Sequence, residues 1–168
     1  MVRIPIAEDC YSTFYLKKNN LYNEANYFDW LVISPSAVHD MFKNDFVDFF
    51  ELDNLRFFSK NTNEFKKTDI TVKDIKYDVY YLHHFNSIDK DYETLKDKFN
   101  RRINRMNDHF KNNEPIEFYY KPCLYDFIKL DNHEWGTLEM KRLFPSIKNT
   151  IISKYNYENP DLITIKYL

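Results

Sequence analysis

Apolar residues recur every three or four positions in two long stretches of the chain, which is the spacing of one face of an α-helix. In the first stretch, Ser34 can cap a helix that begins at Pro35, and the apolar positions continue to residue 50. The second stretch covers residues 89–111 and has a charged outer face. Its apolar stripe comprises Ile88, Tyr92, Leu95, Phe99, Ile103, Met106 and Phe110. We therefore predict one helix over 34–50 and another over 89–111.

Short apolar runs bounded by polar residues predict the strands. The clearest runs are residues 2–7, 75–82 and 115–121, and residues 149–155 and 162–168 are typical of closing strands. Three further segments connect them: a helix capped by Asp9 over residues 10–20, a hairpin or irregular excursion over 55–74, and a mainly helical stretch over 123–144 interrupted near Gly136. The pattern therefore alternates strands with helices.

This alternation favours an α/β fold. We predict a three-layer, Rossmann-like α/β domain with a mostly parallel central sheet that contains residues 2–7, 75–82 and 115–121. A chain of 168 residues is long enough to bury a substantial core, so a single domain over residues 1–168 is expected.

Composition excludes several classes of function. Gly136 is the only glycine, so neither a glycine-rich dinucleotide fingerprint nor a phosphate-binding loop can form, and we expect no cofactor. A formal net charge of −2 gives no positive field for nucleic acid. No apolar run reaches the roughly 18 residues of a membrane span, and no signal peptide is visible. We expect a cytoplasmic protein, located in the host cytoplasm or the virion if a virus encodes it. The sequence does not identify a substrate, and a protein partner is possible.

Two residues carry the chemistry that the pattern suggests. In an open α/β sheet, ligands bind beyond the carboxyl ends of the strands. Cys10 follows the first predicted strand and His83 follows the strand over 75–82, so parallel strands would bring both to one rim. A thiol at a helix start gains from the positive helix end, but Glu8 and Asp9 oppose this effect, so a histidine is needed to activate it. A buried structural cysteine remains the alternative.

The other cysteine, histidines and cations have simpler interpretations. Cys123, with no histidine nearby in sequence, is interpreted as structural, as are His39 and His109. A metal site from His83, His84, His133 and either Asp29 or Asp89 is not expected, because adjacent strand residues point to opposite faces. The basic segment over 101–105 lies among acidic residues and is interpreted as a solvated helix face.

Several short motifs resemble a family of putative papain-like cysteine peptidases found in bacteria and large DNA viruses. The motifs are Cys10 at a helix start, Phe28-Asp29-Trp30, the segments over 44–50 and 98–106, and His83-His84-Phe85. The resemblance implies Cys10, Asp29 and His83 as catalytic residues, and His84, Trp30 and Asn86 are expected to line the site. It also brings a papain-like α+β fold as the alternative architecture.

Two functions remain open. The first is a cysteine-dependent hydrolase or acyl-type transferase, in which Cys10 is the nucleophile, His83 the general base and Asp29 a residue that orients the base or the substrate. The second is a non-catalytic α/β module that binds a partner protein through exposed aromatic residues. The first hypothesis predicts that Cys10 and at least one of His83 and His84 share one rim of the sheet.

Overall fold

The computed structural model describes residues 1–7, 10–60, 70–122 and 133–168. Its helices are α1 (Tyr11–Lys18), α2 (Pro35–Lys43), α3 (Ile88–Lys111) and α4 (His133–Tyr155), with short 3₁₀ turns at Leu52–Asn54 and Pro160–Leu162. Its strands are β1 (Val2–Ala7), β2 (Leu31–Val32), β3 (Leu55–Lys60), β4 (Ile70–Asp74), β5 (Val79–Phe85), β6 (Ile116–Lys121) and β7 (Ile163–Tyr167). The mixed α/β class is therefore confirmed.

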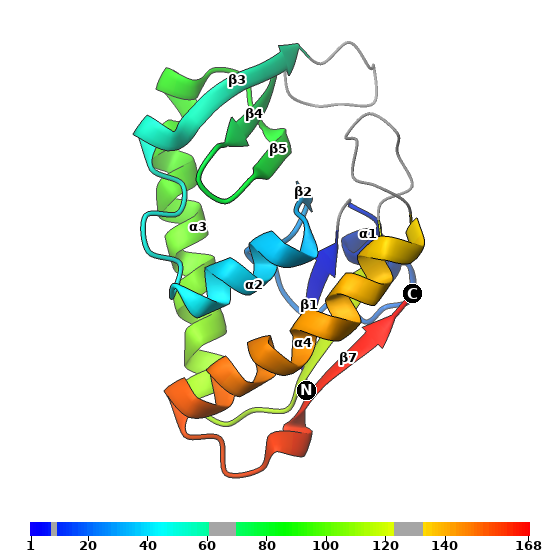
Figure 1. Ribbon diagram of the computed structural model, residues 1–168. Helices are drawn as coiled ribbons and strands as arrows, with labels where there is room; N and C mark the ends of the chain where they lie inside the picture. Colours follow the sequence, from blue (N-terminus) through cyan, green and yellow to red (C-terminus); the bar gives the residue numbers. More distant parts are fainter. Residues whose placement is uncertain (8–9, 61–69, 123–132) are drawn as a thin grey trace.

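One sheet is parallel and has the order β1-β6-β7. The strands predicted over 2–7, 115–121 and 162–168 form it, with Ile4 opposite Phe118 and Phe118 opposite Ile165. Parallel neighbours need long crossover connections, and the chain between β1 and β6 includes the second sheet and α3. Figure 1 shows α3 running along one side of the molecule, from the second sheet down to the start of β6.

The second sheet is antiparallel and has the order β2-β5-β4-β3. The prediction that residues 75–82 belong to the parallel sheet is therefore wrong. The cause is a tight turn after β4, where the Asp74 carboxylate accepts the backbone N–H groups of Lys76 and Tyr77, and Asp78 adopts a left-handed φ of 55°. This turn returns β5 directly alongside β4, and a hairpin is antiparallel. The two-sheet arrangement is consistent with the papain-like α+β alternative.

Two helical segments differ from the sequence prediction. Helix α2 ends at Lys43 because Asp45, Phe46, Asp48 and Phe50 adopt left-handed φ angles, although Phe46 and Phe50 are still buried as the pattern implied. Residues 149–155 form the end of α4 and not a strand. The buried residues of α4, namely Met140, Phe144, Ile147 and Ile151, repeat at helical spacing, so burial along one helix face overrides the β-branched pair near its end.

The helix predicted over 89–111 is confirmed as α3, and its apolar stripe is buried. Ring contacts concentrate on Phe50 and Phe99, whose centroids lie 4.8 Å apart. Phe50 also contacts Tyr81, Phe85 and Tyr92. One cluster of buried apolar side chains joins both sheets and all of α2, α3 and α4, and so fixes the antiparallel sheet relative to the parallel one.

Candidate functional site

Cys10 is the residue before the first turn of α1. The backbone N–H of Phe14 donates to the Cys10 carbonyl at 3.1 Å, and the Cys10 side chain does not cap the helix. The thiol is half-buried and packs against the small apolar cluster formed by Val32, Tyr80 and Leu82 on the antiparallel sheet. It therefore lies between the positive end of α1 and the strands β2 and β5. The proposed helix cap, Asp9, lies outside the described residues.

His83 lies in an irregular part of β5. The pairing with β4 shifts here, since Ile70 pairs with Phe85 whereas Val72 pairs with Tyr81. Extra residues in β5 disrupt the strict alternation of faces, and such bulges re-aim side chains. His83 directly follows Leu82, one of the three residues of the apolar cluster against which Cys10 packs. The sequence argument that Cys10 and His83 both follow parallel strands of one sheet is wrong, because β1 and β5 belong to different sheets and His83 lies within β5.

Trp30 accompanies His83. The two rings meet edge to face with centroids 6.1 Å apart, and the Lys17 ammonium lies 4.9 Å from the indole. Trp30 has a φ of 64°, an uncommon conformation for a bulky residue and one that marks a tight turn before β2. We expected both rings of the Phe28-Asp29-Trp30 turn to be buried. Phe28 is buried, but Trp30 is half-buried.

Asp29 is completely buried and its carboxylate is saturated with donors. Thr13 Oγ1 donates at 3.2 Å and the Asn26 backbone N–H at 2.9 Å, and the Tyr22 hydroxyl donates as well. Burial raises the pKa of Asp29 above its usual range, whereas these hydrogen bonds and the nearby Arg102 oppose that change. The carboxylate therefore ties α1 to the turn that carries Trp30, as the expectation of a donor-held carboxylate required.

His84 is in a different environment from His83. Its ring meets Tyr81 and Phe99, and its Nδ1 lies 3.4 Å from Lys98 Nζ. Burial, together with the positive charges of Lys98 and Arg102, lowers the pKa of His84 to about 3. His84 is therefore neutral at physiological pH and accepts from Lys98. A group with such a low pKa is a poor base for a thiol, which leaves His83 as the histidine of interest.

Asn86, the remaining expected site residue, lies on the surface where β5 leads into α3. Its backbone N–H donates to Asp91 Oδ2 at 2.6 Å, and the Ser87 N–H donates to the same oxygen at 3.0 Å. This pair of bonds satisfies exposed amides at the start of α3.

No set of three or more histidine, cysteine, aspartate or glutamate side chains is placed to hold a metal ion in the described ranges. Cys123 and the side chain of His133 lie outside those ranges. His39 lies on α2 and contacts Asp40 and Ser146.

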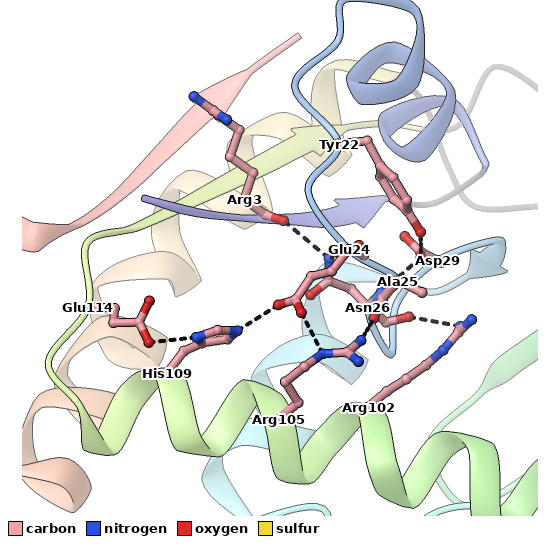
Figure 2. A network of polar contacts seen from close by, with 10 residues as sticks. All are labelled: Arg3, Tyr22, Glu24, Ala25, Asn26, Asp29, Arg102, Arg105, His109 and Glu114. Carbon is pink, nitrogen blue, oxygen red and sulfur yellow. Dashed lines mark hydrogen bonds and ion pairs between the residues drawn. The ribbon is translucent and has the colours of Figure 1, made fainter.

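In the basic segment of α3, Arg101 is exposed as the sequence interpretation expected, whereas Arg102 and Arg105 are half-buried and make tertiary contacts. Arg102 Nη1 donates to the Asn26 carbonyl at 3.0 Å, and Arg105 Nε lies 2.7 Å from Glu24. Figure 2 shows these side chains reaching from α3 to the segment that leads into the Asp29 turn. Sequence reasoning missed Thr13, Tyr22 and Arg102, because nothing local pairs them with a residue far away in the chain.

The model of the family described as "Putative papain-like cysteine peptidase" matches residues 3–157, which include β1, both sheets apart from β7, and helices α1 to α4. The chain belongs to this family. Cys10 directly precedes α1 and His83 lies in β5, and both fall within the matched residues. No curated protein and no solved structure gives a significant match. Within the residues described for this family member, no helix is long and apolar enough to cross a membrane.

Proposed function

We propose that this member of the papain-like cysteine peptidase family is a cysteine-dependent hydrolase or acyl-type transferase, with Cys10 as nucleophile and His83 as general base. The observation that carries the proposal is the packing of the half-buried Cys10 thiol, at the start of α1, against the apolar cluster of Val32, Tyr80 and Leu82, whose member Leu82 directly precedes His83. Family membership supports the same chemistry at the coarser level of a cysteine hydrolase.

The reaction needs one proton shuttle. His83 accepts the proton of the Cys10 thiol, and the thiolate attacks the carbonyl carbon of an acyl substrate. The tetrahedral intermediate collapses to a thioester when the leaving group departs with the proton from the His83 imidazolium. Water, or another nucleophile in a transferase, then gives its proton to His83 and releases the acyl group. Cys10 and His83 return to their starting states.

The remaining residues support the pair in this proposal. The Asp29 carboxylate holds the turn through Thr13 and Asn26, and this turn presents Trp30 edge-on to the His83 ring. Asp29 thereby acts on His83 through Trp30, as a positioning residue. His84 is the poorer candidate for the base, because its pKa of about 3 makes it too weak to take a proton from a thiol and it already accepts a hydrogen bond from Lys98.

The rate of iodoacetamide alkylation of Cys10 as a function of pH tests the proposal. A Cys123→Ser background leaves Cys10 as the only thiol. We expect Cys10 to titrate at least about one unit below the ordinary thiol pKa of about 8.5, because an imidazolium stabilises the thiolate. His83→Ala should abolish this shift and slow alkylation near pH 6.5 by about tenfold.

The matched control is His39→Ala, which removes a histidine from α2 and should leave the alkylation profile unchanged. The proposal fails if Cys10 titrates near 8.5 in the wild-type protein and His83→Ala has no effect. That result would favour the alternative, a non-catalytic module that binds a partner protein. The exposed rings of Phe57 and Phe58 on β3, and of Tyr11 and Phe14 on α1, would be available for such contacts.

A further inference from the structure

Side chains on one face of α3 bind residues 24–26, which lead into the Asp29 turn. Arg102, Arg105 and His109 succeed one another at three- and four-residue steps, so they share a helix face. Arg102 and Arg105 donate to the backbone carbonyls of Asn26 and Ala25, respectively. Figure 2 shows all three side chains directed from α3 toward this segment.

His109, the last of the three residues along α3, contacts two carboxylates. Its Nε2 lies 2.6 Å from Glu24 Oε1 and its Nδ1 lies 2.8 Å from Glu114 Oε1. A neutral imidazole carries only one N–H group. Its other nitrogen would then place a lone pair against a carboxylate oxygen, and that contact would be repulsive. Both contacts are hydrogen bonds only when the ring is a cation with two N–H groups. The two distances therefore describe a protonated His109.

The charged groups around His109 come from three segments. Glu24 belongs to the loop between α1 and β2, and Glu114 to the connection between α3 and β6. On α3 itself, Arg105 shares the Glu24 carboxylate, while Asp108 pairs with Lys111. The two carboxylates favour the cation and Arg105 partly offsets Glu24. The side chains of His109 and Glu24 are only 19% and 26% exposed, so solvent screens this contact incompletely.

We propose that protonated His109 is a pH-dependent clamp that holds the loop over residues 22–30 against α3. The loop is continuous with the candidate site. Asn26 donates its side-chain amide to the Arg3 carbonyl at 3.2 Å and its backbone N–H to the Asp29 carboxylate at 2.9 Å. Asp29 precedes Trp30, which meets His83. Release of Glu24 from His109 would thus loosen the segment that positions the Trp30 ring.

The direction of the pH effect follows from the sign of the pKa change. Hydrogen bonds to Glu114 and Glu24 raise the pKa of His109 above its usual 6.5, although burial acts in the opposite sense. A group whose pKa is raised by folding stabilises the fold below its unfolded pKa, and this contribution is lost as the pH rises through the folded value. The clamp is therefore closed in mildly acidic solution and opens as the pH rises through the raised pKa of His109.

If the proposed function holds, the clamp also affects how catalytic activity depends on pH. Rising pH converts the Cys10 thiol to thiolate but releases the turn that carries Trp30. The activity profile should accordingly fall on its alkaline side at the pKa of His109.

Backbone amide exchange over residues 22–29 tests the clamp without any need for activity. Exchange is measured from about pH 5.5 to 8.5, after correction for intrinsic rates, in a Cys10→Ser protein that lacks thiol chemistry. We expect protection of this loop to fall by about tenfold across the titration of His109. The His109 ring itself, followed by NMR, should titrate above 6.5.

The variant His109→Gln should expose the loop at every pH and remove the pH dependence. His39→Gln is the matched control and should retain the wild-type profile. Glu114→Gln leaves the Glu24 contact in place and should shift the midpoint of the loss of loop protection to lower pH. This variant replaces His109→Gln in the test if His109→Gln does not fold. The proposal is overturned if loop protection is flat while His109 titrates, or if His109→Gln keeps the wild-type profile. Because the assay uses Cys10→Ser, a failed alkylation test would leave this result unaffected.

Discussion

Replacement of Phe99 by alanine will lower the free energy of unfolding by roughly 3 to 5 kcal/mol, through lost burial and the cavity left behind. Phe99 is fully buried in α3. Its ring lies 4.8 Å from Phe50, 5.4 Å from Tyr27 and 5.5 Å from Tyr81. These rings come from separate parts of the chain and are held by tertiary packing. The cavity left by Phe99→Ala therefore cannot be filled unless β5 moves. Urea unfolding at equilibrium measures the loss.

Phe57→Ala is the matched control for this measurement. Phe57 is 57% exposed on β3, so its removal should change the free energy of unfolding by no more than about 0.5 kcal/mol. If Phe99→Ala were as mild as Phe57→Ala, the rings around Phe50 could not be a tightly packed part of the core between α3 and the antiparallel sheet.

Asp29→Ala should be the second strongly destabilising substitution, at about 3 kcal/mol. The change leaves the Thr13 hydroxyl, the Tyr22 hydroxyl and the Asn26 N–H without their acceptor. A buried donor without a partner costs about 1 to 3 kcal/mol, and relaxation toward solvent around the half-buried Tyr22 keeps the total below the sum. Thermal and urea unfolding, compared with wild type, measure the effect.

Asp29→Asn separates the hydrogen bonds from the charge. The amide keeps one oxygen for Tyr22 and Asn26, and its NH₂ group can donate to Thr13, so the loss should be about 1 kcal/mol or less. Since burial raises the pKa of Asp29, its stabilising contribution is present below the unfolded pKa and declines as the pH rises through the folded value. The difference between wild type and Asp29→Asn should therefore be larger at about pH 4.5 than at pH 7. An opposite trend would mean that folding lowers this pKa.

The same variant informs the function. If Asp29→Asn leaves the pH profile of Cys10 alkylation unchanged, the carboxylate acts only on the turn. A shift toward the profile of His83→Ala would show that Asp29 positions the base through Trp30.

Local sequence patterns were sufficient to predict the helices and strands whose buried residues repeat at regular helical or strand spacing. The apolar stripe of α3 repeats at helical spacing over its whole length, and β1, β6 and β7 are short apolar runs bounded by polar residues. The helix predicted over residues 10–20 is α1, which begins one residue later, at Tyr11, and ends at Lys18. His83 was suggested both by its place near the end of a predicted strand and by the family resemblance, and its catalytic role stays a prediction.

Strand partners and long-range polar contacts were decided by the tertiary structure. The sequence of β5 suits either sheet, and the Asp74 turn and the ring of Phe50 place it in the antiparallel one. The difference between His83 and His84 depends on a bulge and on Lys98, fourteen positions away from His84. Contacts such as Arg102 with Asn26 join residues more than seventy positions apart. The sequence alone therefore determined where the helices and most strands lie, since these follow from neighbouring residues, whereas the environment of each candidate site residue arose only when distant segments packed together.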